Sequence, residues 1–352
     1  MSRMTSKERV RAAVEHREGD RVPLYASYTP ETAALLRQVT GTDEFDVGIA
    51  MGNDIVKDCV GLEMSYYLND QPSYVCPWGI TWRNVRNQTG HYTEIIDFPL
   101  AGDEDKLTGY NIPNPDDDRQ YENARLLLNR YGDDHWVVGS CQCSIFEASW
   151  YLRGLDTFLV DLALNPDYVN ELMDKVMEFP RIAGLRYLEL GVDMLWFGDD
   201  VATQAGMMIS PDMWRTYLKP RYAKIFAEFK AKRPDIVIAY HSCGNCEAII
   251  PELIEIGLDV LNPIQPLALD PLMVKRKYGS DLCLFGAMDV QRVMPFGSVP
   301  EVRAEVRRLI DGCGKGGGFI LAGAHHLQSD TDPAKVFAFY EAGKEFGVYR
   351  QH

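Results

Sequence analysis

The segment HSCGNC, residues 241–246, contains residue types that bind a soft metal ion. His241 and Cys243 are two positions apart, so in an extended backbone their side chains project to the same side. Imidazole nitrogen and thiolate sulfur are zinc ligands, and a catalytic zinc site uses three protein ligands and keeps one position open. The spacing therefore predicts two ligands of a zinc site and requires a third.

Other interpretations of this segment stay open. A histidine beside a cysteine on a buried strand can be a hydrogen-bonded core residue. Cys243 and Cys246 also form a CxxC pair, which is typical of redox sites, but no redox-fold pattern follows it. The other close pair, Cys141 and Cys143, is interpreted as small core residues.

Short apolar runs alternate with amphipathic stretches from about residue 136 onward, and they supply strands that could position these side chains. The runs are WVVGSC (136–141), DMLWFGDD (193–200), DIVIAYHSCG (235–244), LDVLNPIQ (258–265), LCLFGAMD (282–289) and GFILAGAHH (318–326). The helices between them begin with a capping residue and proline, at Asn165–Pro166, Ser210–Pro211, Asp270–Pro271 and Asp332–Pro333. The alternation of strand and helix implies a parallel sheet, and runs that are apolar throughout are typical of strands inside a barrel.

The amino-terminal third has a different pattern. A capping box of Thr5 and Glu8 begins a first helix, a strand follows at 22–27, and a second helix begins at about Pro30. Residues 77–100 alternate polar with aromatic and branched residues around a turn at 87–90, which indicates a β-hairpin. No linker or repeat is evident, so one elaborated domain over residues 1–352 is favoured over two.

Polar residues gather where the predicted strands end, and in a parallel barrel these ends surround the active site. They are Cys141, Gln142, Cys143 and Glu147, then Asp199 and Asp200, then Asn262 and Gln265, then Asp289 and Gln291, and finally His325, His326 and Gln328. Because barrel closure brings the strand ends around one mouth, His325 is the best candidate for the third zinc ligand. Asp199 and Asp200 are adjacent and point oppositely, so we expect only one of them to face the pocket.

Composition excludes several classes of protein. The 352 residues are 46% hydrophobic and 25% charged, which describes a folded globular chain. The formal net charge of −15 disfavours nucleic acid and anionic membrane surfaces as partners. The first twenty residues hold no apolar signal segment, and we expect a cytoplasmic protein. Its eight cysteines are then thiols or metal ligands and not a disulfide framework.

Several longer segments together resemble the uroporphyrinogen decarboxylase superfamily over nearly the whole chain. They include SKERVRAAVEHREGDRVPLYA at the amino terminus, GDDVATQAGMMISPDMWRTYLKPRY, HSCGNCEAIIPELIEIGLDVLNPIQP and LCLFGAMDVQRVMPFGSVPEV. The resemblance implies an α/β fold, a single distorted TIM (β/α)8 barrel with an amino-terminal helical extension and a β-hairpin insertion at about 77–100.

Two chemistries occur in this superfamily. Its porphyrin-pathway decarboxylases hold the substrate carboxylates with an early arginine-rich motif, and the corresponding stretch ASYTPETAALLRQ has no paired arginines. The resemblance is closer in motif to the zinc-dependent corrinoid methyltransferases, whose His-x-Cys pattern His241 and Cys243 match. A noncatalytic tetrapyrrole or corrinoid binder is the third alternative.

The methyltransferase resemblance implies roles for particular residues. It implies zinc held by His241, Cys243 and His325, with His326 or Cys246 in reserve as the third ligand. The remaining predicted site residues are Asp199, Glu147 and Gln204 as catalytic residues, and Asn262, Gln265 and Asp289 as cofactor-binding residues. The substrate would be a small methylated, above all methoxylated, compound. The corrinoid would come on a separate carrier protein, since the chain has no DxHxxG motif, and a homodimer is left open.

Overall fold

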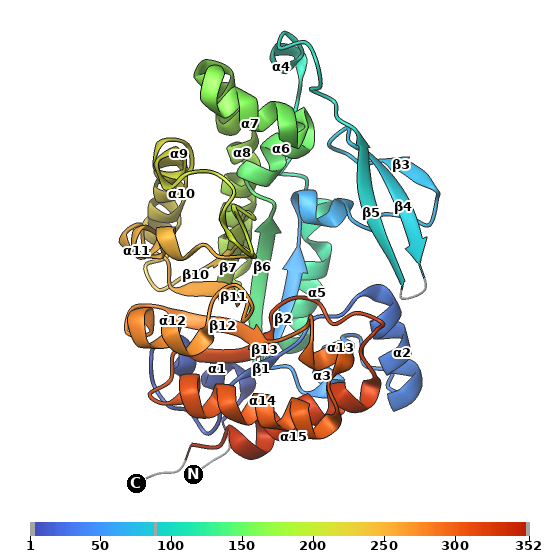
Figure 1. Ribbon diagram of the computed structural model, residues 1–352, viewed down its shortest axis with the longest axis vertical. Coiled ribbons are helices and arrows are strands. Elements are labelled where there is room, and N and C mark those ends of the chain that lie inside the picture. The colour runs from blue at the N-terminus through green and yellow to red at the C-terminus, as the bar shows by residue number, and fades with distance from the viewer. Residues whose placement is uncertain (1–3, 88–89, 350–352) are drawn as a thin grey trace.

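The computed structural model describes residues 4–87 and 90–349, and a parallel eight-stranded barrel lies at its centre (Figure 1). Neighbouring strands follow the order β1-β13-β12-β11-β10-β7-β6-β2. The strands are β1 (Leu24–Tyr25), β2 (Ile55–Cys59), β6 (Trp136–Gln142), β7 (Met194–Gly198), β10 (Val237–His241), β11 (Val260–Ile264), β12 (Cys283–Met288) and β13 (Phe319–Gly323). Each apolar run predicted to be a strand contains one, so the α/β barrel is confirmed.

Strand β2 is the barrel strand that the sequence interpretation missed. Lys57 and Asp58 interrupt its apolar pattern, because one charged side chain points to each face of the strand. Asp58 is buried against the outer helices, where it accepts hydrogen bonds from Asn123 Nδ2 at 2.7 Å and Tyr187 Oη at 2.8 Å. Lys57 faces the barrel interior and becomes part of the site described below.

Side chains close the barrel between β1 and β2, the two strands at the ends of the sheet order. Asn53 accepts from the amide of Ala26 and donates to its carbonyl, at 2.8 and 2.9 Å. Asp54 accepts from the amide of Leu24 at 2.8 Å, and its own amide donates to the Leu24 carbonyl at 2.9 Å. These bonds replace a ladder at this seam and explain how a distorted barrel satisfies its edge groups.

Helices cover the outside of the barrel and one end of it (Figure 1). They are α1 (Ser6–Val14), α2 (Pro30–Thr40), α3 (Val47–Met51), α4 (Lys106–Gly109), α5 (Glu122–Tyr131), α6 (Phe146–Arg153), α7 (Leu155–Leu164), α8 (Pro166–Leu190), α9 (Pro211–Met213), α10 (Lys219–Lys232), α11 (Ile250–Glu255), α12 (Pro271–Tyr278), α13 (Val293–Phe296), α14 (Val299–Leu309) and α15 (Pro333–Phe346). Short 3-10 or π turns are η1 (Gly61–Ser65), η2 (Asp118–Tyr121), η3 (Trp214–Leu218), η4 (Glu247–Ile249) and η5 (Ile310–Gly314). Within the described ranges, no helix is both long and apolar enough to cross a membrane.

The predicted helix starts agree with the structure, with one difference. The capping box of Thr5 and Glu8 is present at α1. Ser210, Asp270 and Asp332 each cap the helix that follows with a side-chain hydrogen bond. Asn165 precedes α8 as predicted but makes no capping bond, since its amide group donates to Glu104 at 2.7 Å instead.

The predicted hairpin forms a small antiparallel sheet beside the barrel mouth (Figure 1). Strands β4 (Thr81–Asn87) and β5 (Gly90–Asp97) pair with each other, and β3 (Ser73–Val75) adds a third strand to β4. The centre of the predicted turn, residues 88–89, lies outside the described part of the chain. Near this end of the hairpin, His91 Nδ1 contacts the Glu31 carboxylate of α2, which attaches the small sheet to the barrel rim. A two-stranded ribbon, β8 (Ala202–Thr203) with β9 (Gly206–Met207), follows β7.

Two apolar clusters correspond to the two faces of the barrel strands. The larger lies between strands and helices and contains Leu195 and Phe197 of β7. The smaller fills the barrel interior and contains the alternate residues Met194 and Trp196. Trp196 packs on Phe285 with ring centroids 5.1 Å apart, which forms a floor below the barrel mouth.

Candidate active site

Strands β7, β10 and β11 bring the main polar side chains to the carboxyl end of the barrel. In the sheet register Gly198 lies opposite His241, and His241 lies opposite Asn262. A Cβ atom on Gly198 would lie 2.1 Å from the His241 carbonyl oxygen, and the residue has a φ of +147°, so glycine is required for this close approach. Because side chains alternate along β7, Asp200 continues the inward series while Asp199 continues the outward one.

Three side chains at these strand ends could hold one metal ion. Ligand atoms of Asp200, His241 and Cys243 all lie within 4.8 Å of one another. His241 Nε2 is 3.6 Å from Cys243 Sγ and 3.6 Å from Asp200 Oδ1. The predicted proximity of His241 and Cys243 is thus present, and the structure adds Asp200, which the sequence interpretation did not select as a ligand.

Asn262 fixes the orientation of the His241 ring. Its amide Nδ2 donates to the Phe285 carbonyl at 3.2 Å, which leaves Oδ1 facing His241 Nδ1 at 2.7 Å. An amide oxygen only accepts, so Nδ1 carries the hydrogen and Nε2 presents its lone pair to Cys243 and Asp200. This is the arrangement that a metal-binding histidine needs from its neighbour.

The donor set suits a divalent ion such as zinc. It offers one nitrogen, one sulfur and one carboxylate oxygen, all of which are zinc ligands. Burial, followed by the charge of Asp200, raises the pKa of the Cys243 thiol above its usual range. The backbone amide of Cys243 donates to Asp200 Oδ1 at 2.7 Å, and no lysine or arginine within the described ranges pairs with that carboxylate. A bound cation would therefore relieve an electrostatic conflict between thiolate and carboxylate.

His325, the predicted third ligand, lines the same cavity but is not one of the three clustered residues. Its ring is open to the cavity, and the surrounding walls, followed by His241, lower its pKa to about 4. His326 lies beside it with ring centroids 5.0 Å apart. Cys246, the reserve ligand, is fully buried. The assignment of the third ligand to His325 therefore stays a prediction, with Asp200 nearer to the His241 and Cys243 pair.

Glu147 and Asp199 occupy successive layers behind this group. Glu147 lines the cavity. Its carboxylate accepts hydrogen bonds from the Asp200 backbone amide at 2.9 Å and from Tyr151 Oη at 3.2 Å. Burial, followed by Asp200 and Asp199, raises the pKa of the Glu147 carboxyl. Asp199 is completely buried and is not among the residues that line the cavity. It accepts from the amides of Ile145 and Glu147, both at 3.0 Å, so it holds the start of α6 and does not fit a group that touches substrate.

Three more predicted site residues lie on the rim and are joined through Gln291. Gln204 and Gln265 both donate to Gln291 Oε1, at 3.3 and 3.1 Å, and Asp289 accepts from the Gln291 amide at 2.8 Å. Gln265 Oε1 also accepts from the amide of Gly244 at 2.8 Å, which supports the turn after Cys243. None of Gln204, Gln265 and Asp289 is among the described residues that line the cavity, whereas Asn262 is.

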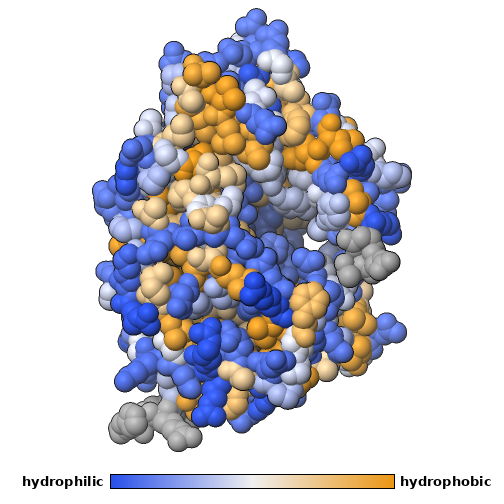
Figure 2. Space-filling model, viewed as in Figure 1, coloured by the Kyte–Doolittle hydropathy of each residue, from blue (hydrophilic) through white to orange (hydrophobic). Residues whose placement is uncertain are grey.

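A cavity of about 450 Å³ opens over these residues at the barrel mouth. Figure 2 shows the molecule hollowed near the middle of the face seen in Figure 1. Aromatic side chains make up much of the wall, namely Tyr25, Tyr28, Tyr66, Tyr67 and Trp196. The polar residues at the strand ends are Gln142, Glu147, Asp200, His241, Asn262, His325 and His326. This size and mixed character suit a small organic molecule.

Lys57, Cys59 and Glu63 line the cavity too and were missed from the sequence. Lys57 Nζ bonds Glu63 Oε1 at 2.5 Å, and Ser140 Oγ donates to Glu63 Oε2 at 2.8 Å. Burial opposes ionisation of Glu63, but the Lys57 charge outweighs it and lowers the pKa of Glu63 to about 2. The available signal was the charged pair Lys57 and Asp58 within a short run of apolar residues.

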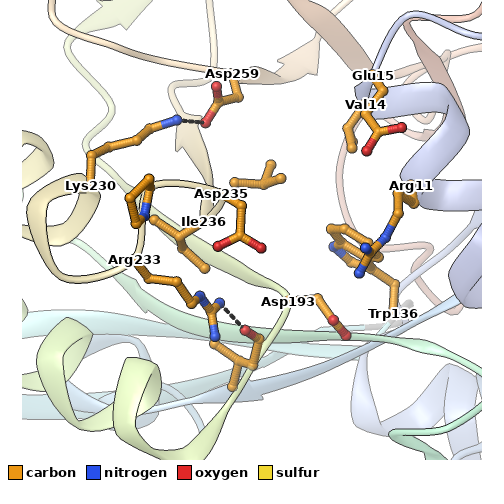
Figure 3. Close-up of a pocket in the computed structure, with 13 residues that line it drawn as sticks. Arg11, Val14, Glu15, Trp136, Asp193, Lys230, Arg233, Asp235, Ile236 and Asp259 are labelled. Atoms are coloured by element: carbon orange, nitrogen blue, oxygen red, sulfur yellow. Dashed lines mark hydrogen bonds and ion pairs between the residues drawn. The ribbon is translucent and has the colours of Figure 1, made fainter.

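A second cavity, of about 360 Å³, lies at the other end of the strands (Figure 3). Its labelled charged residues have both signs, and Lys230 pairs with Asp259 at 2.6 Å. Asp193 pairs with Lys7 at 2.9 Å and accepts from the Val137 amide at 2.9 Å. Its lining contains no histidine or cysteine, so of the two cavities only the one at the carboxyl end offers imidazole and thiol groups to a metal ion.

Comparison with known proteins places the chain in a family. The model of the family described as uroporphyrinogen decarboxylase (URO-D) matches residues 89–346. The chain belongs to the uroporphyrinogen decarboxylase family. The resemblance inferred from the sequence segments is therefore confirmed.

Relatives in this family have different activities. The chain is 21% identical to the methylcobamide:CoM methyltransferase MtaA of Methanosarcina barkeri over 322 residues, which cover 89% of this chain and 91% of that one. It is also 21% identical to the uroporphyrinogen decarboxylase of Pseudomonas aeruginosa over 263 residues, 75% and 71% of the two chains. The structure of a methyltransferase from Methanosarcina mazei superposes with a TM-score of 0.74 at 20% identity and covers 98% of this chain and 99% of that one, which shows a shared fold. Sequence identity alone does not separate the two activities, so the site residues must.

Proposed function

We propose that the protein is a zinc-dependent methyltransferase that moves a methyl group between a small methylated substrate and a corrinoid on a separate carrier protein. The observation that carries this proposal is the grouping of Asp200, His241 and Cys243 at the base of an open barrel mouth, with the Nε2 lone pair of His241 directed at it by Asn262. The methyltransferase names of relatives in the family support the same reaction class.

Residues of this chain would hold zinc and the substrate in fixed positions. His241 and Cys243 are two ligands, and Asp200 or His325 is the third. Zinc bound here would supply Lewis acidity to the methylated oxygen or sulfur of the substrate. Asn262 holds His241, and Glu147 holds the Asp200 backbone through its amide. The aromatic walls exclude water from a flat substrate and leave its methyl group facing the mouth.

The methyl group would leave the substrate for the cobalt of a Co(I) corrinoid, which supplies the electron pair of the new bond. The substrate heteroatom keeps the electrons of the broken bond, and a proton from solvent or a cation held by Asp200, His241 and Cys243 would balance its charge. A methoxylated substrate fits this site because a ligand set with a single thiolate would leave zinc more Lewis-acidic than a thiolate-rich set, and so better able to polarise an ether oxygen. The reaction belongs in the cytoplasm, where the eight free cysteines of the chain stay reduced.

Uroporphyrinogen decarboxylation is the alternative reaction, and the cavity does not favour it. A substrate with eight carboxylates needs several cationic partners. Apart from histidines, Lys57 is the single basic residue among the described residues that line the cavity, and Glu63 already pairs with it. The structure thus agrees with the absence of paired arginines near the first strand.

The experiment that tests the proposal supplies a Co(I) corrinoid, free or carrier-bound, to the purified protein with a panel of methoxylated and methylated-thiol compounds. We expect the corrinoid absorbance to change as cobalt accepts a methyl group, and we expect no conversion of uroporphyrinogen in a parallel assay. Conversion of uroporphyrinogen, with no methyl transfer from any donor, would contradict the proposal.

A further inference from the structure

Lys57 places an ammonium group on the cavity wall with unused hydrogen-bonding capacity. Its side chain is 12% exposed, and among the described residues Glu63 Oε1 is the one acceptor within hydrogen-bond distance of Nζ. The ammonium also lies 5.1 Å from the centre of the Trp196 ring. This cation–π interaction stabilises the charge but supplies no hydrogen-bond acceptor oxygen. An ammonium has three N–H groups, so donors remain for a ligand in the cavity.

Glu63 is itself fully engaged, so it does not account for the remaining donors. One carboxylate oxygen accepts from Lys57 and from Cys59 Sγ at 3.3 Å, and the other accepts from Ser140 Oγ at 2.8 Å. The pair lies at the cavity wall, on an interior position of β2 that apolar residues occupy elsewhere in the barrel.

Tyr25 adds a second donor beside Lys57. It lies at the end of β1, lines the cavity, and its ring packs edge-on against Phe285 with centroids 5.5 Å apart. Within residues 4–87 and 90–349 its hydroxyl makes no hydrogen bond to protein, although the residue is only 8% exposed. Two groups with unused donor capacity, one of them cationic, therefore line the same cavity.

The distance between Lys57 and the cluster of Asp200, His241 and Cys243 limits the length of a ligand that contacts both. The centre of the Trp196 ring is near both, at 5.1 Å from Lys57 Nζ and 6.4 Å from the centre of the His241 ring. The ammonium and the imidazole are thus no farther apart than these two distances together. A single aromatic ring with a substituent at each end fits such a span, and Tyr66, Tyr67 and Tyr28 provide flat walls for it.

We propose that Lys57 and Tyr25 form an oxyanion subsite, so that the methyl donor is a compact, ring-sized molecule with an acidic group, a carboxylate or sulfonate, at the end opposite its methylated heteroatom. This inference rests on the proposed function for the role of the second end. The acidic group accepts from Lys57 Nζ and Tyr25 Oη, which orients the methylated end toward Asp200, His241 and Cys243. The subsite specifies the substrate and takes no part in bond breaking.

The aromatic wall could also suggest a methylated ammonium ligand, and the observations disfavour it. Aromatic side chains with nearby carboxylates are typical of sites for quaternary ammonium groups. A fixed lysine ammonium on the same wall repels such a ligand, and the Glu63 carboxylate of that wall is already paired with the lysine. The cationic ligand is therefore kept as an outcome of the test.

The test compares the binding of four ligands that share one methoxyphenyl ring, by calorimetry in the absence of any corrinoid. They are 4-methoxybenzoate, 4-methoxybenzenesulfonate, the neutral 4-methoxybenzamide and the cationic 4-methoxyphenyltrimethylammonium. We expect at least one anion to bind about tenfold or more tightly than the amide, as charge-assisted hydrogen bonds allow. The same preference is expected after zinc removal, which excludes a carboxylate bound to the metal. The two anions separate a carboxylate from a sulfonate subsite.

Two variants and a control assign the preference to these residues. Lys57→Met is expected to lower the affinity for the anion about tenfold while the affinity for the amide changes by less than about twofold. Tyr25→Phe keeps the ring and is expected to lower the affinity for the anion by a factor of about three to five. Lys224→Met removes an equal charge from the exposed face of α10, remote from the cavity, and should change neither affinity. If Lys57→Met does not fold, the ligand series on the wild type and Tyr25→Phe still decide the question.

The subsite is contradicted if neither anion binds more tightly than the amide. It is also contradicted if the cation binds best, or if no anion binding is detected at millimolar concentration. Failure of the proposed function gives a different result. Anion preference without methyl transfer to a corrinoid leaves the subsite in place and contradicts the reaction. Methyl transfer from neutral donors as efficient as from acidic ones leaves the reaction in place and contradicts the subsite.

Discussion

The adjacent residues Asp199 and Asp200 should respond in opposite ways to the same substitution. Asp199 is completely buried and accepts from the amides of Ile145 and Glu147 and from the hydroxyl of Tyr222. Asparagine has one accepting oxygen, so Asp199→Asn leaves about one buried donor without an acceptor, at a cost of about 1–3 kcal/mol in the free energy of unfolding. The substitution does not alter Asp200, His241 or Cys243, so zinc binding should persist.

Asp200→Asn should have the converse effect. The Asp200 side chain is 37% exposed, and asparagine can still accept from the Cys243 amide, so the free energy of unfolding should change by less than about 0.5 kcal/mol. The loss of a carboxylate 3.6 Å from His241 Nε2 should weaken zinc binding by about tenfold or more. Urea unfolding measures the first quantity, and competition with a chelator measures the second. If Asp199→Asn lost zinc while Asp200→Asn kept it, or if Asp199→Asn were as stable as the wild type, the assignment of inward and outward residues on β7 would be refuted.

Three further predictions concern residues around this group. Cys243→Ser should lose most of its bound zinc and its activity, whereas Cys246→Ser should keep its zinc. Metal analysis of the purified variants measures this, and the opposite pattern would show that Cys246 and not Cys243 is the ligand. Asn262→Leu removes the acceptor that fixes the His241 ring, and the zinc dissociation constant should rise by about tenfold to a hundredfold in chelator competition, with an unchanged value arguing against that role. Burial, followed by the His325 charge, lowers the pKa of His326 to about 3 from an ordinary 6.5. Below pH 6.5 the unfolded chain therefore binds a proton that the folded chain does not, and the free energy of unfolding decreases as the pH is lowered. In zinc-free protein His326→Gln should reduce this loss between pH 7 and pH 5 by about 2 kcal/mol, measured by urea unfolding, and an identical pH dependence in variant and wild type would contradict it.

The barrel could be predicted from the sequence because its strands are short apolar runs bounded by helix-start signals. Strand β2 escaped because Lys57 and Asp58 make it appear polar, although each charge has a specific partner on its own face of the sheet. Those partners, Glu63 and Asn123, lie in other elements, so only the folded chain shows that both side chains have hydrogen-bond partners. Local hydropathy cannot represent such pairing.

The site was predictable where spacing along one strand decides it. His241 is the last residue of β10, and the side chain of Cys243, two residues further along the chain, lies beside it as predicted, with Sγ 3.6 Å from His241 Nε2. The choice of Asp200 over Asp199 needed the register of β7 against β10, which Gly198 opposite His241 supplies. The choice of a third ligand depends on distances between strand ends, and residue order around a barrel does not give those distances.

The inner wall of the cavity could not be predicted from local motifs. Tyr25 belongs to a two-residue strand, and Tyr66 follows a 3-10 turn, so neither has a motif around it. Their convergence with Trp196 depends on closure of the barrel between β1 and β2, the strands at the two ends of the sheet order. The sequence shows these residues only as isolated aromatic and charged positions. Their place in one cavity wall depends on packing between segments far apart in the sequence.

The central claim is that zinc held by His241 and Cys243 is required for methyl transfer, and a titration of zinc into metal-free protein tests it most directly. The measurement follows the rate of corrinoid methylation from an active donor against the amount of zinc bound per chain. We predict no transfer without zinc, a rate that rises in proportion to bound zinc up to about one ion per chain, and no recovery in a folded His241→Ala variant. Transfer at the full rate by metal-free protein, or by His241→Ala, would contradict the account.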